Sequence, residues 1–125
     1  TDNSSLDIYS TNTKSEYSIS DEDRIRVFCL DHKKQSRASK LPTGIKSVVM
    51  DKVYYRIVDA DTGKVAMDFG EDDNSTRLST DSFGMYFDFV FNSLPIKRSY
   101  TIEYLVVTAG TRQKIKDSRA RFLVV

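Results

Sequence analysis

The chain has one cysteine and one histidine, and these stand three residues apart at Cys29 and His32. A thiol beside an imidazole is the arrangement that activates a cysteine nucleophile. The residues before Cys29 alternate between apolar and polar types, which is typical of a strand, and a spacing of three on a strand directs two side chains to opposite faces. We therefore interpret His32 as a loop residue and Cys29 as a small buried hydrophobic side chain, predict no catalytic residue and expect no enzyme.

An acidic segment, DADTG, has the first ligands of a calcium loop, with Asp59 and Asp61 at the first and third ligand positions. The remaining positions do not fit. Gly63 occupies the fifth position, Lys64 stands where the loop needs its glycine, and Gly70 replaces the final glutamate. The segment instead has the residues of a hairpin turn.

A second acidic stretch, EDD at residues 71–73 with Asp68 nearby, could chelate a hard cation. We interpret it as a solvated surface loop. The sequence therefore predicts no metal site and no cofactor.

Basic residues gather in two segments of the chain. They are Lys33, Lys34, Arg37 and Lys40 in one loop, and Arg112, Lys114, Lys116, Arg119 and Arg121 near the end. Neither segment is interleaved with aromatic residues as a single-strand nucleic-acid platform requires, and 19 basic against 18 acidic side chains leave a net charge of only +1. We predict no nucleic-acid partner, and expect the segregated charges to orient docking of copies or other proteins.

The composition is that of one soluble globular domain. The 125 residues include 39% hydrophobic and 30% charged residues, with seven Phe and seven Tyr, which suffices for a packed core. No apolar run is long enough to span a bilayer, so no membrane partner is expected. A single cysteine excludes an intrachain disulfide and suits assembly in a reducing compartment.

Apolar residues recur at every second position through most of the chain, and no segment has a helical period. The expected strands cover residues 24–30, 53–57, 65–69, 85–91, 99–107 and a last strand in which Ala120, Phe122 and Val124 face inward. The strongest core stripe is Met85, Phe87, Phe89 and Phe91. This pattern predicts an all-β fold, an antiparallel immunoglobulin- or fibronectin III-like β-sandwich over residues 21–125.

The stretch SLPIKRSY has the spacing of a tyrosine corner, in which a buried tyrosine at the start of a strand bonds back to the preceding turn. Leu94 would fill the core, Pro95 would fix the turn, and Tyr100 would begin the strand. The familiar form of this motif has glycine where Lys97 stands. The corner is predicted here as architecture, with an unusual turn.

Residues 1–20 are rich in Ser and Thr and poor in large apolar groups, so we predict an extended N-terminal arm. Leu6 with Ile8, and Tyr17 with Ile19, are alternating pairs. Each pair is expected to add a short strand to a sheet edge, on this domain or on a neighbour.

The segments VYYRIVDADTGKV, NSTRLSTDSFGMYFDF and LPIKRSYTIEYLV resemble Ig-like modules of virion structural proteins of tailed bacteriophages, in particular myoviruses of cyanobacteria. The resemblance implies a non-enzymatic structural or decorating component of the capsid, neck or tail. Such a component is assembled in the host cytoplasm and contacts other virion proteins or copies of itself.

The alternative is an Ig-like recognition module whose end loops bind a carbohydrate or a cell-surface protein. An exposed aromatic platform of Tyr9, Tyr54 and Tyr86 would favour that alternative.

Overall fold

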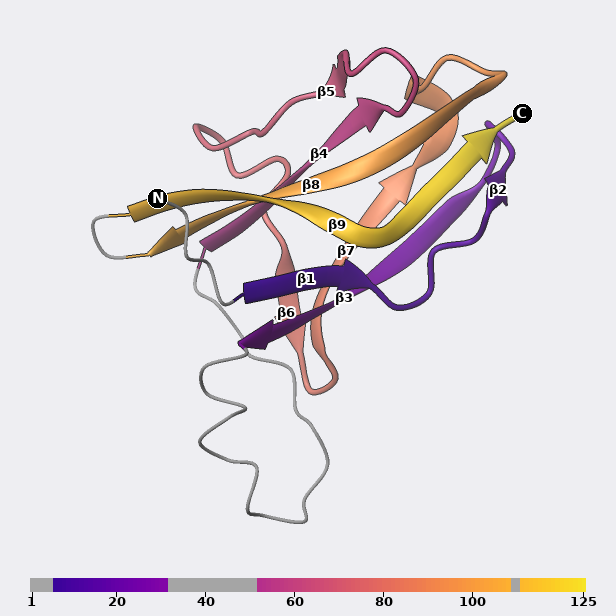
Figure 1. Cartoon of the computed structure of the whole chain (residues 1–125). Coiled ribbons are helices and arrows are strands. Elements are labelled where there is room, and N and C mark those ends of the chain that lie inside the picture. Colours follow the sequence, from indigo (N-terminus) through magenta and orange to yellow (C-terminus); the bar gives the residue numbers. More distant parts are fainter. Residues whose placement is uncertain (1–5, 32–51, 109–110) are drawn as a thin grey trace.

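The computed structural model describes residues 6–31, 52–108 and 111–125, which form two sheets (Figure 1). One sheet has the order β1 (Leu6–Ser10), β3 (Glu22–Asp31), β7 (Gly84–Val90), β6 (Ser79–Asp81). The other has the order β2 (Glu16–Tyr17), β9 (Thr111–Val124), β8 (Arg98–Thr108), β4 (Lys52–Asp59), β5 (Val65–Met67). The only helical turn of the described residues is η1 (Phe91–Ser93), so the predicted all-β class is confirmed, and the two sheets are consistent with a β-sandwich.

The core lies between the inward faces of the two sheets, where period-two apolar residues meet. The predicted stripe on β7 is buried, with Phe87 stacked on Tyr55 at a centroid distance of 3.9 Å. Phe91 continues it and stacks on Tyr17 at 4.0 Å. Burial of Ala120, Phe122 and Val124 is also confirmed. Cys29 is completely buried, as predicted.

The predicted tyrosine corner is present. Tyr100 is 1% exposed, and its hydroxyl donates a hydrogen bond of 2.7 Å to the carbonyl oxygen of Pro95. Lys97 takes the left-handed φ of +62° for which glycine is the usual residue, and its N–H bonds to the carbonyl of Val124 at the end of β9. The unusual turn is thus a lysine in a glycine conformation, held by the adjacent strand.

The described part of the N-terminal segment contributes one strand to each sheet. β1 pairs antiparallel with β3, and β2 pairs parallel with β9. Ile8 and Tyr17 are both buried in the core. The expected strand addition is therefore confirmed on this domain itself, while an arm separate from the sandwich is not.

A buried carboxylate connects β1 to the opposite sheet. Asp117 accepts hydrogen bonds from the backbone N–H of Ser10 at 2.8 Å and from the Tyr104 hydroxyl at 2.7 Å. Its other oxygen accepts from the N–H groups of Arg119 and Ala120, both at 2.8 Å, where β9 shifts its register against β8. Burial raises the pKa of Tyr104 well above its usual value, so the phenol stays a donor. The one Asp117 carboxylate thus accepts hydrogen bonds from all four donors.

One expected strand is shorter than predicted. The residues of 65–69 are in strand conformation only from Val65 to Met67, and Val65 is 42% exposed. Phe69 lies beyond the strand, where the Arg56 guanidinium stands 4.9 Å from its ring centre. The turn before it is as predicted: the Asp59 carboxylate accepts from the backbone N–H groups of Asp61 and Thr62, and Gly63 has a φ of +77°.

Candidate interaction surface

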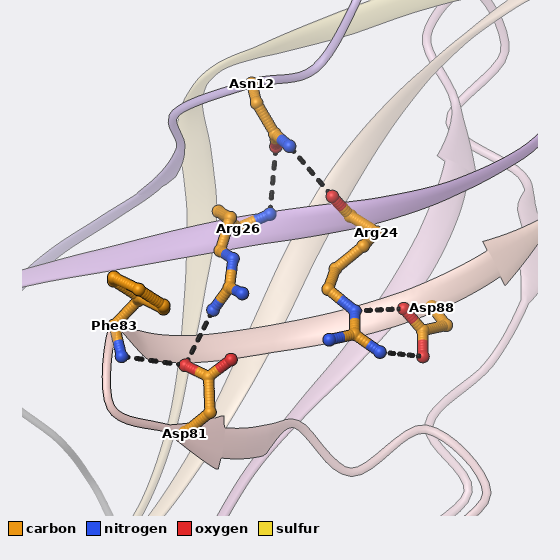
Figure 2. Close-up of polar contacts among 6 residues, drawn as sticks. All are labelled: Asn12, Arg24, Arg26, Asp81, Phe83 and Asp88. Carbon is orange, nitrogen blue, oxygen red and sulfur yellow. Dashed lines mark hydrogen bonds and ion pairs between the residues drawn. The ribbon is translucent and has the colours of Figure 1, made fainter.

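Two arginines gather with Phe83 and Tyr86 on the outer face of the β1-β3-β7-β6 sheet. Figure 2 shows the arginines, Phe83 and their carboxylate partners. On β3 the polar positions alternate with buried Ile25 and Val27, so they point away from the core. We call this surface the arginine–aromatic face. It consists of Arg24, Arg26, Asp81, Phe83, Tyr86 and Asp88.

The strand register places Arg24 directly opposite Asp88. Its Nε and Nη2 atoms donate to the two carboxylate oxygens of Asp88 at 2.7 and 3.1 Å. The same guanidinium lies 4.1 Å from the ring centre of Tyr86. A bidentate ion pair and a ring contact together hold the guanidinium in one orientation.

The second arginine is held by the neighbouring hairpin. Arg26 donates from Nη1 to Asp81 at 2.8 Å, and its guanidinium lies 5.0 Å from the Tyr86 ring centre. The hydrogen bond from Arg26 lowers the pKa of Asp81 to about 2. The Tyr86 ring thus contacts both guanidinium groups, each tied to a carboxylate from a different strand.

Phe83 projects from the turn between β6 and β7 beside this stack. Its side chain is 83% exposed, and the Arg26 guanidinium is 5.6 Å from its ring centre. Its N–H donates to Asp81 at 2.9 Å, and Gly84 closes the turn with a φ of +119°. The turn therefore presents a large aromatic side chain to solvent on a fixed backbone.

The three tyrosines of the carbohydrate alternative are not brought together. Tyr54 is buried on β4 of the other sheet. Tyr9 stacks on Phe28, with the Arg119 guanidinium 4.0 Å from its ring centre. Since guanidinium groups lie over Tyr9 and Tyr86, these rings offer no bare stacking platform.

The sheet edge on the β3 side of this face is closed by a side chain (Figure 2). Beyond the end of β1, the Asn12 amide donates to the carbonyl of Arg24 at 2.8 Å and accepts from the N–H of Arg26 at 2.9 Å. An amide side chain thereby takes the place of a neighbouring strand. We call this the sealed edge.

The acidic residues singled out in the sequence lie mostly beside basic groups. Asp68 is 3.5 Å from Arg56, and Glu71 forms an ion pair with Arg112. Asp59 pairs with Arg98 at 3.0 Å.

Part of the segregated charge that was predicted to orient docking forms ion pairs within the molecule. Within residues 6–31, 52–108 and 111–125, no three Asp, Glu, His or Cys side chains are grouped as metal ligands would be. His32 and the basic loop of residues 33–40 lie outside the described residues.

Sequence reasoning did not identify the arginine–aromatic face. The alternation along each strand predicts only that these residues lie on its outer side. The pairing of Arg24 with Asp88 joins residues 64 positions apart, so it could not be predicted from local spacing.

Comparison with family models, curated proteins and solved structures finds no match to this chain. None of the described residues belongs to a helix that could span a membrane.

Proposed function

We propose that the protein is a non-enzymatic structural or decorating component of a tailed-phage virion, acting through protein–protein contacts. The virion assignment rests on the sequence resemblance to phage Ig-like modules. The contact role rests on the arginine–aromatic face.

The strand order supports an Ig-like identity for the sandwich. Immunoglobulin domains place their first, second, fifth and fourth strands in one sheet and the third, sixth and seventh in the other. With β1 and β2 taken as the two halves of a split first strand, β1-β3-β7-β6 and β9-β8-β4 have that order, and β5 extends the second sheet. The tyrosine corner at the start of β8 agrees with it.

The observation that carries the contact role is the Arg24–Tyr86–Arg26 stack beside exposed Phe83. Arginine and aromatic residues dominate the energetically important positions of protein interfaces. Immobilising a flexible side chain costs about 0.5–1.5 kcal/mol on binding, and the two carboxylates have already fixed these arginines. The face is thus preorganised for a partner. The burial of Cys29 in the core supports a non-enzymatic role.

The test is purification from the native source, followed by sizing and mass spectrometry of the proteins that co-migrate. We expect a particle much larger than the 14.3 kDa chain. Phe83→Ala should reduce incorporation at least tenfold, whereas Val65→Ala, at an exposed apolar residue of the other sheet, should not.

Two results would contradict the proposal. A native chain that migrates alone would remove the structural role. Binding to glycans with no protein partner would favour the carbohydrate-recognition alternative.

A further inference from the structure

The edge of the β1-β3-β7-β6 sheet opposite the sealed edge is only half covered. β6 pairs with β7 from Ser79 opposite Tyr86 to Asp81 opposite Gly84. β7 then continues to Val90, paired with β3 alone. The last residues of β7 therefore lack a second neighbouring strand among the described residues.

The direction of the exposed backbone groups follows from one hydrogen bond. Phe91 donates its N–H to the carbonyl of Asp21 at 3.1 Å, continuing the register of β7 with β3. Because bonded and non-bonded pairs alternate in an antiparallel ladder, Phe87 and Phe89 direct their backbone groups toward β3. Asp88 and Val90 direct their backbone groups to the opposite side, where β6 no longer pairs with β7. We call these two residues the open edge.

A groove runs along the open edge and separates it from the other sheet. Its volume is about 410 Å³, and Asp88, Phe89 and Val90 form one wall. Tyr55 and Met67 provide apolar surface inside it. A strand added to the open edge would direct alternate side chains into this groove and onto the outer face, where Val90 is 43% exposed.

The charge around the open edge is negative. Asp68 and Asp88 line the groove, and Glu22 and Asp23 line a second hollow on the other side of Val90. Among the described residues, Arg24 is the one basic residue lining either hollow, and Arg56 lies 3.5 Å from Asp68. Asp88 is already paired with Arg24 and Asp68 with Arg56, so Glu22 and Asp23 are the carboxylates left to favour a basic partner.

We propose that the open edge binds an extended, basic segment of a partner polypeptide as an added β-strand. Backbone groups of Asp88 and Val90 pair with the segment, an apolar side chain enters the groove, and Lys or Arg side chains lie beside the carboxylates. The inference rests on the proposed contact role and specifies the kind of partner. Proteins usually protect free strand edges, as Asn12 does at the sealed edge, whereas no described residue protects this one beside the groove.

The test uses the full chain and a fluorescein-labelled heptapeptide that alternates lysine with valine. A second heptapeptide with glutamate in place of lysine is the charge control. Fluorescence anisotropy should give saturable binding of the lysine peptide, at least tenfold tighter than that of the glutamate peptide. Amide hydrogen exchange should slow at Asp88 and Val90 when the lysine peptide is bound.

Variants then locate the contact. Val90→Pro removes one edge N–H and should weaken binding about tenfold, with circular dichroism and a denaturant titration confirming that it folds. Glu22→Lys should weaken binding at least threefold. Asp61→Lys makes the same charge change on the β4–β5 turn and should alter binding less than twofold.

Absence of saturable binding, or binding that leaves exchange at Asp88 and Val90 unchanged, would overturn the inference. The peptide assay uses the isolated chain, so this failure is independent of whether the native chain resides in a particle. Conversely, a chain absent from any particle would refute the proposed function without affecting strand addition.

Discussion

The two edges of the β1-β3-β7-β6 sheet differ in whether their backbone groups have hydrogen-bond partners. At the sealed edge, β1 covers half of β3, and the Asn12 amide satisfies the backbone beyond it. At the open edge, β6 covers the first half of β7, and no described residue pairs with Asp88 or Val90 on that side. A single asparagine suffices to close an edge. The edge that the described residues leave uncovered is where we propose that a partner strand binds.

The largest expected effect comes from removing the clamp that holds β1 in place. Asp117→Ala leaves the Ser10 N–H, the Tyr104 hydroxyl and two further N–H groups without their acceptor. Each unsatisfied buried donor costs at least about 1 kcal/mol, and four donors lose their acceptor, so we expect a loss of at least about 4 kcal/mol in the free energy of unfolding, measured by denaturant titration.

Ser118→Ala is the matched control for that variant. Its side chain makes one exposed hydrogen bond, to Asp7, and the expected change is below about 0.5 kcal/mol. A loss below about 1 kcal/mol in Asp117→Ala would mean that β1 does not depend on the clamp.

Hydrogen exchange compares adjacent residues of β7 directly. The N–H groups of Phe87 and Phe89 face β3, whereas those of Asp88 and Val90 face the open side. We expect exchange of the second pair to be at least about a hundredfold faster, measured by NMR on the free chain. Equal protection of all four amides would show that the open edge is covered in solution.

Unsealing the protected edge should have a moderate effect. Asn12→Ala removes two exposed hydrogen bonds to the backbone of β3, for an expected loss of about 1 kcal/mol. The amide of Arg26 should then exchange faster. Asn12→Asp keeps the acceptor and loses the donor, so it should fall between wild type and alanine; an alanine variant with unchanged Arg26 exchange would contradict the sealing role.

The smallest expected effect is a titration on the arginine–aromatic face. Because the folded-state pKa of Asp81 is lowered from 3.8 to about 2, its pairing with Arg26 stabilises the fold above pH 3.8. That contribution is lost as the pH falls toward 2. In Arg26→Gln, carboxyl NMR should find the Asp81 pKa closer to 3.8.

Asp88 provides the internal control for this titration. Its pKa is lowered chiefly by its hydrogen bonds to Arg24, so it should move less in Arg26→Gln. An unchanged Asp81 pKa in that variant would show that the Phe83 N–H, and not Arg26, holds the carboxylate.

Local patterns of the sequence predict the core well. Period-two burial identified the β7 stripe, and the spacing from Leu94 to Tyr100 identified the tyrosine corner, because both depend on residues close together in the chain. The turn after Asp59 followed from its Asp and Gly residues for the same reason. The described N-terminal segment was harder, since its few apolar residues gave no sign that Ile8 and Tyr17 are fully enclosed.

Long-range register accounts for what the sequence did not predict. Asp117 accepts a hydrogen bond from a residue 107 positions away in the sequence. Its sequence neighbours do not distinguish a buried carboxylate from a solvated one. Arg24 and Arg26 were evident as outward residues of one strand. Their carboxylate partners became known only from the pairing of β3 with β7 and β6.

The parallel pairing of β2 with β9 determines how the domain resists tension. Leu123 and Val125 donate to the carbonyls of Ser15 and Tyr17, and Ile19 donates to the carbonyl of Val125. A pull that draws the residues before Glu16 away from those after Val124 slides these parallel strands along each other. All three bonds are then loaded together in shear, whereas an antiparallel pair pulled from one end opens bond by bond like a zip. The hydrogen bonds of the short β2 strand are thus expected to raise the force needed to unfold the domain by stretching.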